Sequence, residues 1–138
     1  MNNHFYDQTF GRHADSDRIF LHTEDGDIRF DAFTAQSAQL ANALVAAGLS
    51  AGDRVAVQAE KSASLLALCS ATMRAGGVYL PLNTGYTPVE LDYFICDARP
   101  AIIIADPAGT ADIQPLADKI GATLFTLDEH GNGSLGAA

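Results

Sequence analysis

The sequence predicts an α/β fold: a mainly parallel sheet with helices on both faces, preceded by a β-hairpin. Three observations predict this class. Short apolar runs alternate with stretches of helical periodicity along most of the chain, as in a parallel sheet built from right-handed βαβ units. The run AIIIA at 101–105 is apolar without interruption, as in a strand covered on both faces. The pair Asp25-Gly26 separates two strand-like runs and predicts a hairpin turn.

The composition indicates one folded domain with an acidic surface. The chain has 138 residues, 48% hydrophobic and 18% charged, which is enough to bury a core. Eight Lys and Arg residues against 17 Asp and Glu residues give a net charge of -9. Such a surface repels phosphate backbones and anionic lipids. We therefore expect no nucleic-acid partner and no membrane partner.

The cysteines and the start of the chain give no targeting or redox signal. Cys69 and Cys96 form no CxxC pair and fall in two expected helices. Reduced structural thiols in a cytoplasmic protein are the simplest interpretation. No apolar stretch approaches the roughly 20 residues of a membrane span, and the first residues lack a signal-peptide pattern.

The first elements are a short helix, a hairpin and a long helix. Residues 1–18 are polar and mixed in charge, with a short helix expected around Phe5 and Phe10. The hairpin is expected at 19–30. Asp31 is the expected N-cap of the long helix, and Gly48 is its expected end. The apolar face of this helix comprises Phe33, Leu40, Leu44 and Ala47.

A strand at 54–59 and a second helix follow. Ser62 is the expected N-cap of this helix, and the glycines at 76–77 end it. Its expected buried face consists of Leu65, Leu68, Cys69, Thr72 and Met73.

The next strand, 78–80, ends at Pro81, which lacks a backbone donor. Thr87 and Glu90 have the spacing of a capping box with proline at the first helical position, and Pro100 closes the helix. Its expected buried stripe is Leu91, Phe94, Ile95 and Ala98.

The last elements are the strand 101–105, a helix ended by Gly121 and a strand at 123–127. The helix has an apolar face of Ile113, Leu116, Ala117 and Ile120. We expect residues 19–128 to form one α/β subdomain after the N-terminal segment 1–18. Residues 129–138 are expected to form a flexible tail that leads to sequence beyond this chain, with GNGS at 131–134 as a flexible turn.

Ligands of open parallel sheets usually bind at the loops beyond the carboxyl ends of the strands. Here these loops are 59–62, 82–86, 106–109 and the segment after Asp128. Lys61 precedes a helix start, where backbone amides and an ammonium bind anions, although capping preferences favour Ser62 as a plain cap and Lys61 as solvated surface. Asn83 and Thr84 have the chemistry to bind a polar ligand, but they are equally ordinary turn residues.

The remaining candidates are weaker. Asp106 follows a strand, yet no second acid is placed beside it by spacing, and a turn or cap role is the better interpretation. The histidines have no HxxxH or HExxH spacing, so no metal site is expected; they are His4, His13, His22 and His130. No local motif for catalysis is present.

Five motifs occur in order within residues 48–106: GDRV at 52–55, EKS at 60–62, RAGG at 74–77, PLNT at 81–84 and VELDY at 89–93. With these motifs, the run from residue 48 to residue 106 resembles the amino-terminal part of the adenylate-forming acyl-CoA synthetases, the AMP-binding superfamily, and especially the malonyl-CoA synthetase branch. The resemblance spans roughly residues 19–128. It implies the amino-terminal subdomain of the large domain of such an enzyme.

The resemblance also implies a reaction. A carboxylic acid reacts with ATP and Mg to give an acyl-adenylate and pyrophosphate, and the acyl group then passes to coenzyme A. The family's Ser/Thr/Gly-rich phosphate loop, later acidic motifs and carboxy-terminal lysine do not occur in these 138 residues. We therefore expect an amino-terminal piece that is inactive alone, with no catalytic residue and no cofactor of its own, and that self-associates through an exposed apolar face.

Two alternatives stay open at this point. The chain is a free-standing flavodoxin-like module that binds a partner or small ligand through the loops at Lys61 and Asn83, or it belongs to a synthetase for a fatty, aromatic or amino acid. The coding sequence beyond Ala138 separates the first alternative from the synthetase hypothesis.

Overall fold

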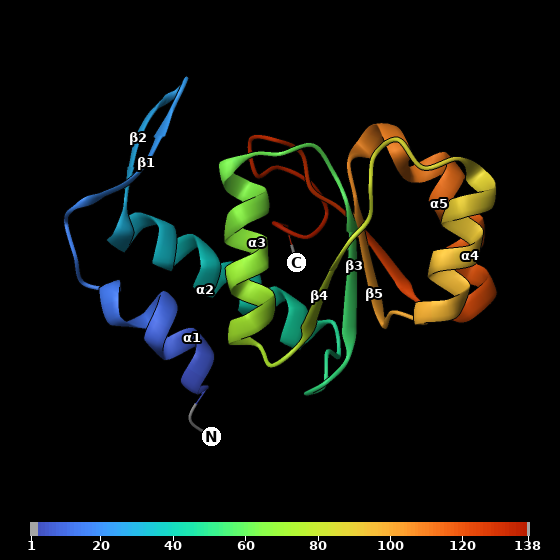
Figure 1. The fold of residues 1–138 in the computed structure, drawn as a ribbon, viewed down its shortest axis with the longest axis horizontal. Coiled ribbons are helices and arrows are strands. Elements are labelled where there is room, and N and C mark those ends of the chain that lie inside the picture. The colour runs from blue at the N-terminus through green and yellow to red at the C-terminus, as the bar shows by residue number, and fades with distance from the viewer. Residues whose placement is uncertain (1–2, 138) are drawn as a thin grey trace.

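The structure is a computed structural model that describes residues 3–137. A four-stranded parallel sheet of order β4-β3-β5-β6 forms its centre, and β1 and β2 form a separate antiparallel hairpin (Figure 1). The strands are β1 (Ile19–Thr23), β2 (Gly26–Arg29), β3 (Arg54–Gln58), β4 (Val78–Pro81), β5 (Ile102–Ala105) and β6 (Thr123–Thr126). The helices are α1 (His4–Thr9), η1 (Gly11–His13), α2 (Phe30–Ala46), α3 (Ala63–Arg74), α4 (Pro88–Ala98), η2 (Pro107–Gly109) and α5 (Thr110–Ile120). The α/β class, the parallel sheet and the hairpin are as the sequence predicts.

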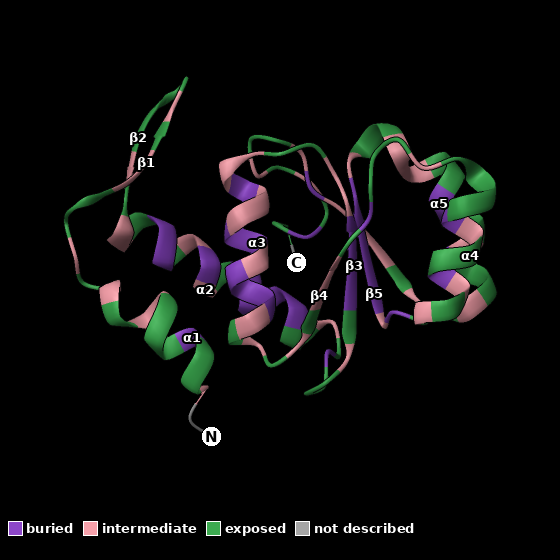
Figure 2. Ribbon diagram, viewed as in Figure 1, coloured by how far each residue is buried: buried purple, intermediate pink, exposed green. Residues whose placement is uncertain are grey.

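Helices cover both faces of the sheet. Helices α2 and α3 lie on one side and α4 and α5 on the other (Figure 1). Successive residues of β5 point to opposite faces. Ile102 and Ile104 join the core under α2 and α3, whereas Ile103 joins the core under α4 and α5. All four residues of β5 are buried (Figure 2), because neither face of this strand meets solvent.

The helix signals in the sequence are confirmed where they depend on local chemistry. Ser62 caps α3, since its Oγ accepts a hydrogen bond from the Leu65 amide at 3.1 Å. Thr87 and Glu90 form the complete capping box of α4. Gly121 ends α5 in the left-handed conformation, at φ 73°.

The expected N-cap of the first long helix is wrong. Helix α2 begins at Phe30, with Arg29 at the cap position, and Asp31 lies in its first turn. Two backbone hydrogen bonds hold this junction: Phe30 N–H donates to the Arg18 carbonyl at 2.9 Å, and Asp31 N–H donates to the Ser16 carbonyl at 3.0 Å. The preceding segment therefore satisfies donors that a side-chain cap would otherwise serve.

The buried face expected for α3 is only partly right. Leu68 and Thr72 are fully buried, but Leu65, Cys69 and Met73 are half-buried. The other buried residues of α3 are Ser64, Ala67, Ser70 and Ala71. Helix α3 packs against α2 as well as against the sheet, and small side chains allow that second close approach.

Helix α4 departs from its expected stripe mainly at Phe94, and Ala98 is half-buried. Leu91 and Ile95 are buried, but Phe94 remains 37% exposed. Its ring stacks on Tyr86 with centroids 4.9 Å apart. The ring thus packs on the loop before the helix and not on the sheet.

Residues 128–135 fold back onto the end of β6. The Leu135 amide donates to the Thr126 carbonyl at 3.2 Å, and Ser134 and Thr126 exchange hydrogen bonds of 2.8 and 2.9 Å. Leu135 is fully buried in the core beneath α2 and α3. The division of the chain at residues 18 and 128, and the flexibility of 129–138, stay predictions.

Among the helices of the described residues, none combines the length and the apolar character needed to cross a membrane.

Candidate functional site

The loops after β3 and β4 enclose a hollow of about 750 Å³ at the carboxyl edge of the sheet. Because the strands are parallel, these loops leave the sheet at the same edge. The hollow is lined by Val57, Ala59, Glu60, Lys61, Leu65, Tyr79, Pro81, Leu82, Asn83, Thr84 and Tyr86. The fold therefore brings Lys61, Asn83 and Thr84, the candidates from the sequence, to one place.

A second hollow of about 320 Å³ adjoins the first. It shares Ala59, Glu60 and Thr84 with the larger hollow and adds Asp106 from the loop after β5. Three of the four loops expected at this edge thus line one continuous region. We name this region, the lining of both hollows, the carboxyl-edge cleft.

Lys61 is the only cation that lines the carboxyl-edge cleft within the described residues, and its side chain is exposed. The adjacent Ser62 hydroxyl already serves as the helix cap. Ser62 therefore has the structural role that capping preferences favour, and Lys61 supplies positive charge to the cleft.

Asn83 shapes the loop after β4. Its Oδ1 accepts a hydrogen bond from the Gly85 amide at 2.8 Å, and its carbonyl accepts one from Gln58 Nε2 at 3.0 Å. The side-chain bond is that of an Asx turn. Asn83 thus holds the loop against β3, while the exposed Thr84 next to it faces both hollows.

Tyr79 lines the apolar side of the cleft and is half-buried. Burial, and then the nearby Cys69, raise the pKa of Tyr79 to about 12. Both causes disfavour the phenolate. Tyr79 therefore remains a neutral phenol and contributes shape and a hydrogen-bonding group, not charge.

Asp106 has the capping role that the sequence favours. Its Oδ1 accepts a hydrogen bond from the Ala108 amide at 2.9 Å, and its carbonyl accepts one from Gly109 at 2.8 Å. The only other carboxylate lining the cleft within the described residues is Glu60. One ammonium thus faces two carboxylates there.

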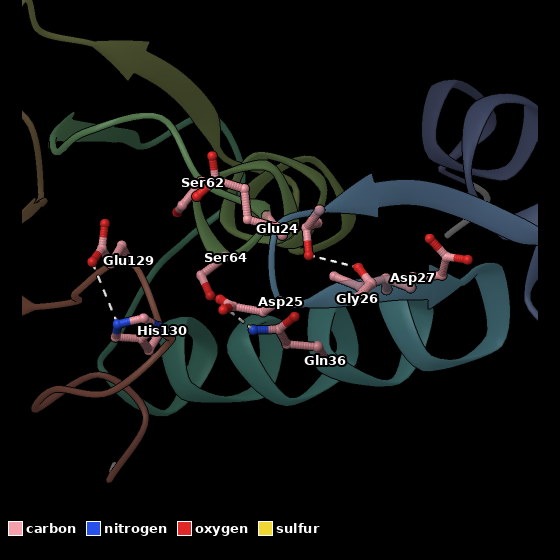
Figure 3. Close-up of a pocket in the computed structure, with 12 residues that line it drawn as sticks. Glu24, Asp25, Gly26, Asp27, Gln36, Ser62, Ser64, Glu129 and His130 are labelled. Carbon is pink, nitrogen blue, oxygen red and sulfur yellow. Dashed lines mark hydrogen bonds and ion pairs between the residues drawn. The ribbon is translucent and has the colours of Figure 1, made fainter.

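The sequence does not predict a further hollow, of about 530 Å³, between the hairpin, the start of α3 and the segment after β6 (Figure 3). Its acidic members are Glu24, Asp25, Asp27 and Glu129. Gln36 Nε2 donates to Ser64 Oγ at 3.4 Å across its base, and His130 lies 3.3 Å from Glu129 at its rim. The hollow forms where segments distant in the sequence pack together, so no local motif predicts it.

Two of the histidines pair with neighbouring carboxylates. His22 pairs with Asp27 at 2.7 Å, and His130 pairs with Glu129. No three His, Cys, Asp or Glu side chains within residues 3–137 are grouped so that they hold a metal ion.

Known proteins match this chain in sequence and in fold. The family model for the AMP-binding enzyme matches residues 8–132. Among solved structures, ATP-bound MatB from Rhodopseudomonas palustris is 48% identical, with a TM-score of 0.91. The match covers 98% of this chain and 27% of MatB.

Other relatives are more distant. Vanchrobactin synthetase VabF from Vibrio anguillarum is 39% identical over 88 residues, which are 64% of this chain and 3% of VabF. An acyl-CoA synthetase from Brucella canis has a TM-score of 0.78 at 22% identity, over 96% of this chain and 24% of that structure. The match to the Brucella canis protein shows a similar fold and nothing more.

The chain thus spans about a quarter of the solved structures it matches and a small fraction of the curated relative. The family model nevertheless covers most of the chain, and the parallel sheet with its preceding hairpin has the fold of MatB. This chain belongs to the AMP-binding enzyme family.

Proposed function

We propose that the chain is the amino-terminal structural part of an ATP-dependent acyl-CoA synthetase. The enzyme would join a carboxylic acid to coenzyme A through an acyl-adenylate and release AMP and pyrophosphate. The observation that carries this proposal is the 48% identity to MatB over 98% of this chain but only 27% of MatB. Such coverage fits one portion of a larger enzyme.

We propose malonate as the acid. The support is the similarity of the segments at 52–55, 60–62, 74–77, 81–84 and 89–93 to the malonyl-CoA synthetase branch. The identity of 48% to MatB stands well above the 22% to the Brucella canis acyl-CoA synthetase. A different acid is the second candidate, favoured by the 39% identity to vanchrobactin synthetase.

The carboxyl-edge cleft does not fit a triphosphate by itself. Lys61 faces Glu60 and Asp106 there, and the whole chain carries a charge of -9. Stabilising a transferring phosphoryl group requires several preorganised donors and a metal ion. We therefore propose that ATP, Mg and coenzyme A bind to further parts of the enzyme. This chain would then have a supporting structural role.

We propose three further properties. The chain alone has no ligase activity, the enzyme works in the cytoplasm on small-molecule substrates, and the chain by itself self-associates. The last rests on exposed apolar side chains of α4: Val89 is 79% exposed and Tyr93 is 65% exposed. Apolar patches of this kind favour association.

The test begins with the coding sequence downstream of Ala138. An open frame that enters a Ser/Thr/Gly-rich segment ending in lysine supports the proposal, and a stop codon after Ala138 favours the free-standing module. The purified full-length product is then assayed for acyl-CoA formation with malonate, acetate, a long-chain fatty acid, benzoate and an amino acid. A preference of at least about tenfold in kcat/KM for malonate, or about 1.4 kcal/mol, supports the acid assignment, and preference for another acid overturns it.

A further inference from the structure

Helices α4 and α5 carry a cluster of three reactive side chains on the face of the sheet opposite α2 and α3. Asp92 Oδ1 accepts a hydrogen bond from Lys119 Nζ at 3.0 Å. The same oxygen accepts one from Cys96 Sγ at 3.5 Å. One carboxylate oxygen therefore holds a thiol and a lysine ammonium that are 23 residues apart in sequence.

The cluster is accessible. The side chains of Lys119 and Asp92 are 60% and 46% exposed, and Cys96 is half-buried. Partly exposed cysteines beside a lysine are the ones that peroxides oxidise selectively. The second cysteine, Cys69, has a different setting: it belongs to α3 and lines a small hollow together with Tyr79, and burial raises the pKa of its thiol.

The charges around the cluster agree with this geometry. The hydrogen bond to Asp92 raises the pKa of Lys119, and Cys96 raises it further, while the hydrogen bond from Lys119 lowers the pKa of Asp92. The thiol and the ammonium thus share Asp92 Oδ1 as their acceptor. Helices α4 and α5 pack against each other, which brings the two groups to the same carboxylate.

We propose that Cys96 and Lys119 are a redox modification site, at which peroxide produces a covalent sulfenamide bond between α4 and α5. In the first step hydrogen peroxide oxidises the thiol to a sulfenic acid and is itself reduced to water. In the second step the Lys119 ammonium first gives one proton to solvent, and the resulting amine attacks the Cys96 sulfur and forms the S–N bond. The S–O bond breaks, and the hydroxyl takes a second proton from the nitrogen and leaves as water. Thiols reverse the bond by reduction.

The site has a structural consequence for the carboxyl-edge cleft. Helix α4 follows directly from the loop of residues 83–87, which shapes the cleft. A covalent bond between α4 and α5 closes a loop of chain and restricts the opening of these helices. Oxidation would therefore stiffen one side of the cleft.

The test treats the purified protein with hydrogen peroxide, blocks remaining thiols, and analyses tryptic peptides by mass spectrometry. Trypsin does not cleave after a lysine whose side-chain nitrogen, Nζ, is bonded to sulfur. We expect a peptide that is not cleaved after Lys119. Its mass should be lower by two hydrogens, about 2 Da, than that of the same uncleaved peptide with a free thiol and a free amine. Dithiothreitol should restore cleavage at Lys119.

Two variants provide matched controls. Lys119→Arg keeps the positive charge and the pairing with Asp92, but its guanidinium does not form the bond, so Cys96 should proceed to sulfinic acid. Cys69→Ser should cross-link as the unchanged protein does. The proposal is overturned if the unchanged protein and Lys119→Arg give the same oxidised forms of Cys96, or if cleavage after Lys119 stays complete while Cys96 becomes oxidised.

Discussion

Gly133 lies so close to Thr126 that a β-carbon at position 133 would stand 2.3 Å from the Thr126 carbonyl oxygen. The contact joins the segment after β6 to the last residue of the sheet. Gly133 also has a φ of 142°, which side-chain-bearing residues rarely adopt. This position therefore accepts only glycine while residues 128–135 remain folded against β6.

Substituting Gly133→Ala should lower the free energy of unfolding by roughly 3 kcal/mol, because backbone strain and a backbone clash act together. Urea denaturation followed by circular dichroism measures the change. Gly48→Ala is the matched control, since Gly48 also has a positive φ, 95°, but open space around it. It should cost only about 1 kcal/mol. Equal losses for the two variants would show that the contact with Thr126 does not constrain the chain.

The capping box of α4 gives a second prediction. Replacing Thr87 with alanine removes the acceptor for the Glu90 amide, which lies 3.3 Å from the hydroxyl, and should cost about 1 kcal/mol of unfolding free energy. Glu90→Gln should leave stability nearly unchanged, because glutamine also serves in a capping box. Thermal unfolding of both variants checks this, and a Glu90→Gln loss as large as that of Thr87→Ala would contradict it.

The segment after β6 should respond to acid. Asp128 Oδ1 accepts hydrogen bonds from the Asn132 and His130 amides at 2.8 and 2.9 Å. These bonds, that of Asn132 first, lower the pKa of Asp128 below its ordinary value of 3.8. Because the folded pKa is the lower one, the stabilisation is complete above the ordinary value and is lost as pH falls through the folded value.

The measurement is hydrogen exchange of the 130–135 amides over a pH series that extends below 3.8, corrected for the intrinsic exchange rate. Protection of these amides should fall in the acid range. Asp128→Asn, which keeps an oxygen acceptor but has no titrating group, should show no such fall that is specific to this segment. The same acid-dependent loss in that variant would assign the effect to another group.

Self-association should depend on the exposed face of α4. The double variant Val89→Asp and Tyr93→Lys should shift the chain toward monomer in sedimentation velocity at high concentration, since it removes the exposed apolar area. Both positions lie outside the two cores, so the thermal midpoint should change little. A clean monomer for the unchanged chain would refute the prediction.

The sequence predicts the elements whose signals are local. The Thr87 and Glu90 pair, the Ser62 cap and the terminal Gly121 each act within a few residues of chain, so their chemistry is visible without the fold. The contacts that join distant segments are not visible in this way. The burial of Leu135 requires a return of the chain onto Thr126, and Phe94 stays exposed because its ring stacks on Tyr86.

For the same reason, the sequence predicts only part of the candidate site. The sequence predicts Lys61, Asn83 and Thr84 at one edge because parallel strands place their carboxyl ends together. The sequence does not predict the acidic hollow at Asp25 and Glu129, because it depends on how the hairpin is oriented relative to α2, the start of α3 and the segment after β6. Periodicity within a segment carries no information on that orientation.

We propose that this chain supports a synthetase and does not itself perform the reaction. The most direct measurement incubates the purified 138-residue chain with ATP, Mg, malonate and coenzyme A and follows pyrophosphate release, with the full-length enzyme as the positive control. We expect release by the chain to equal that of a sample without protein. Release that rises in proportion to the concentration of the chain and requires malonate would contradict the claim.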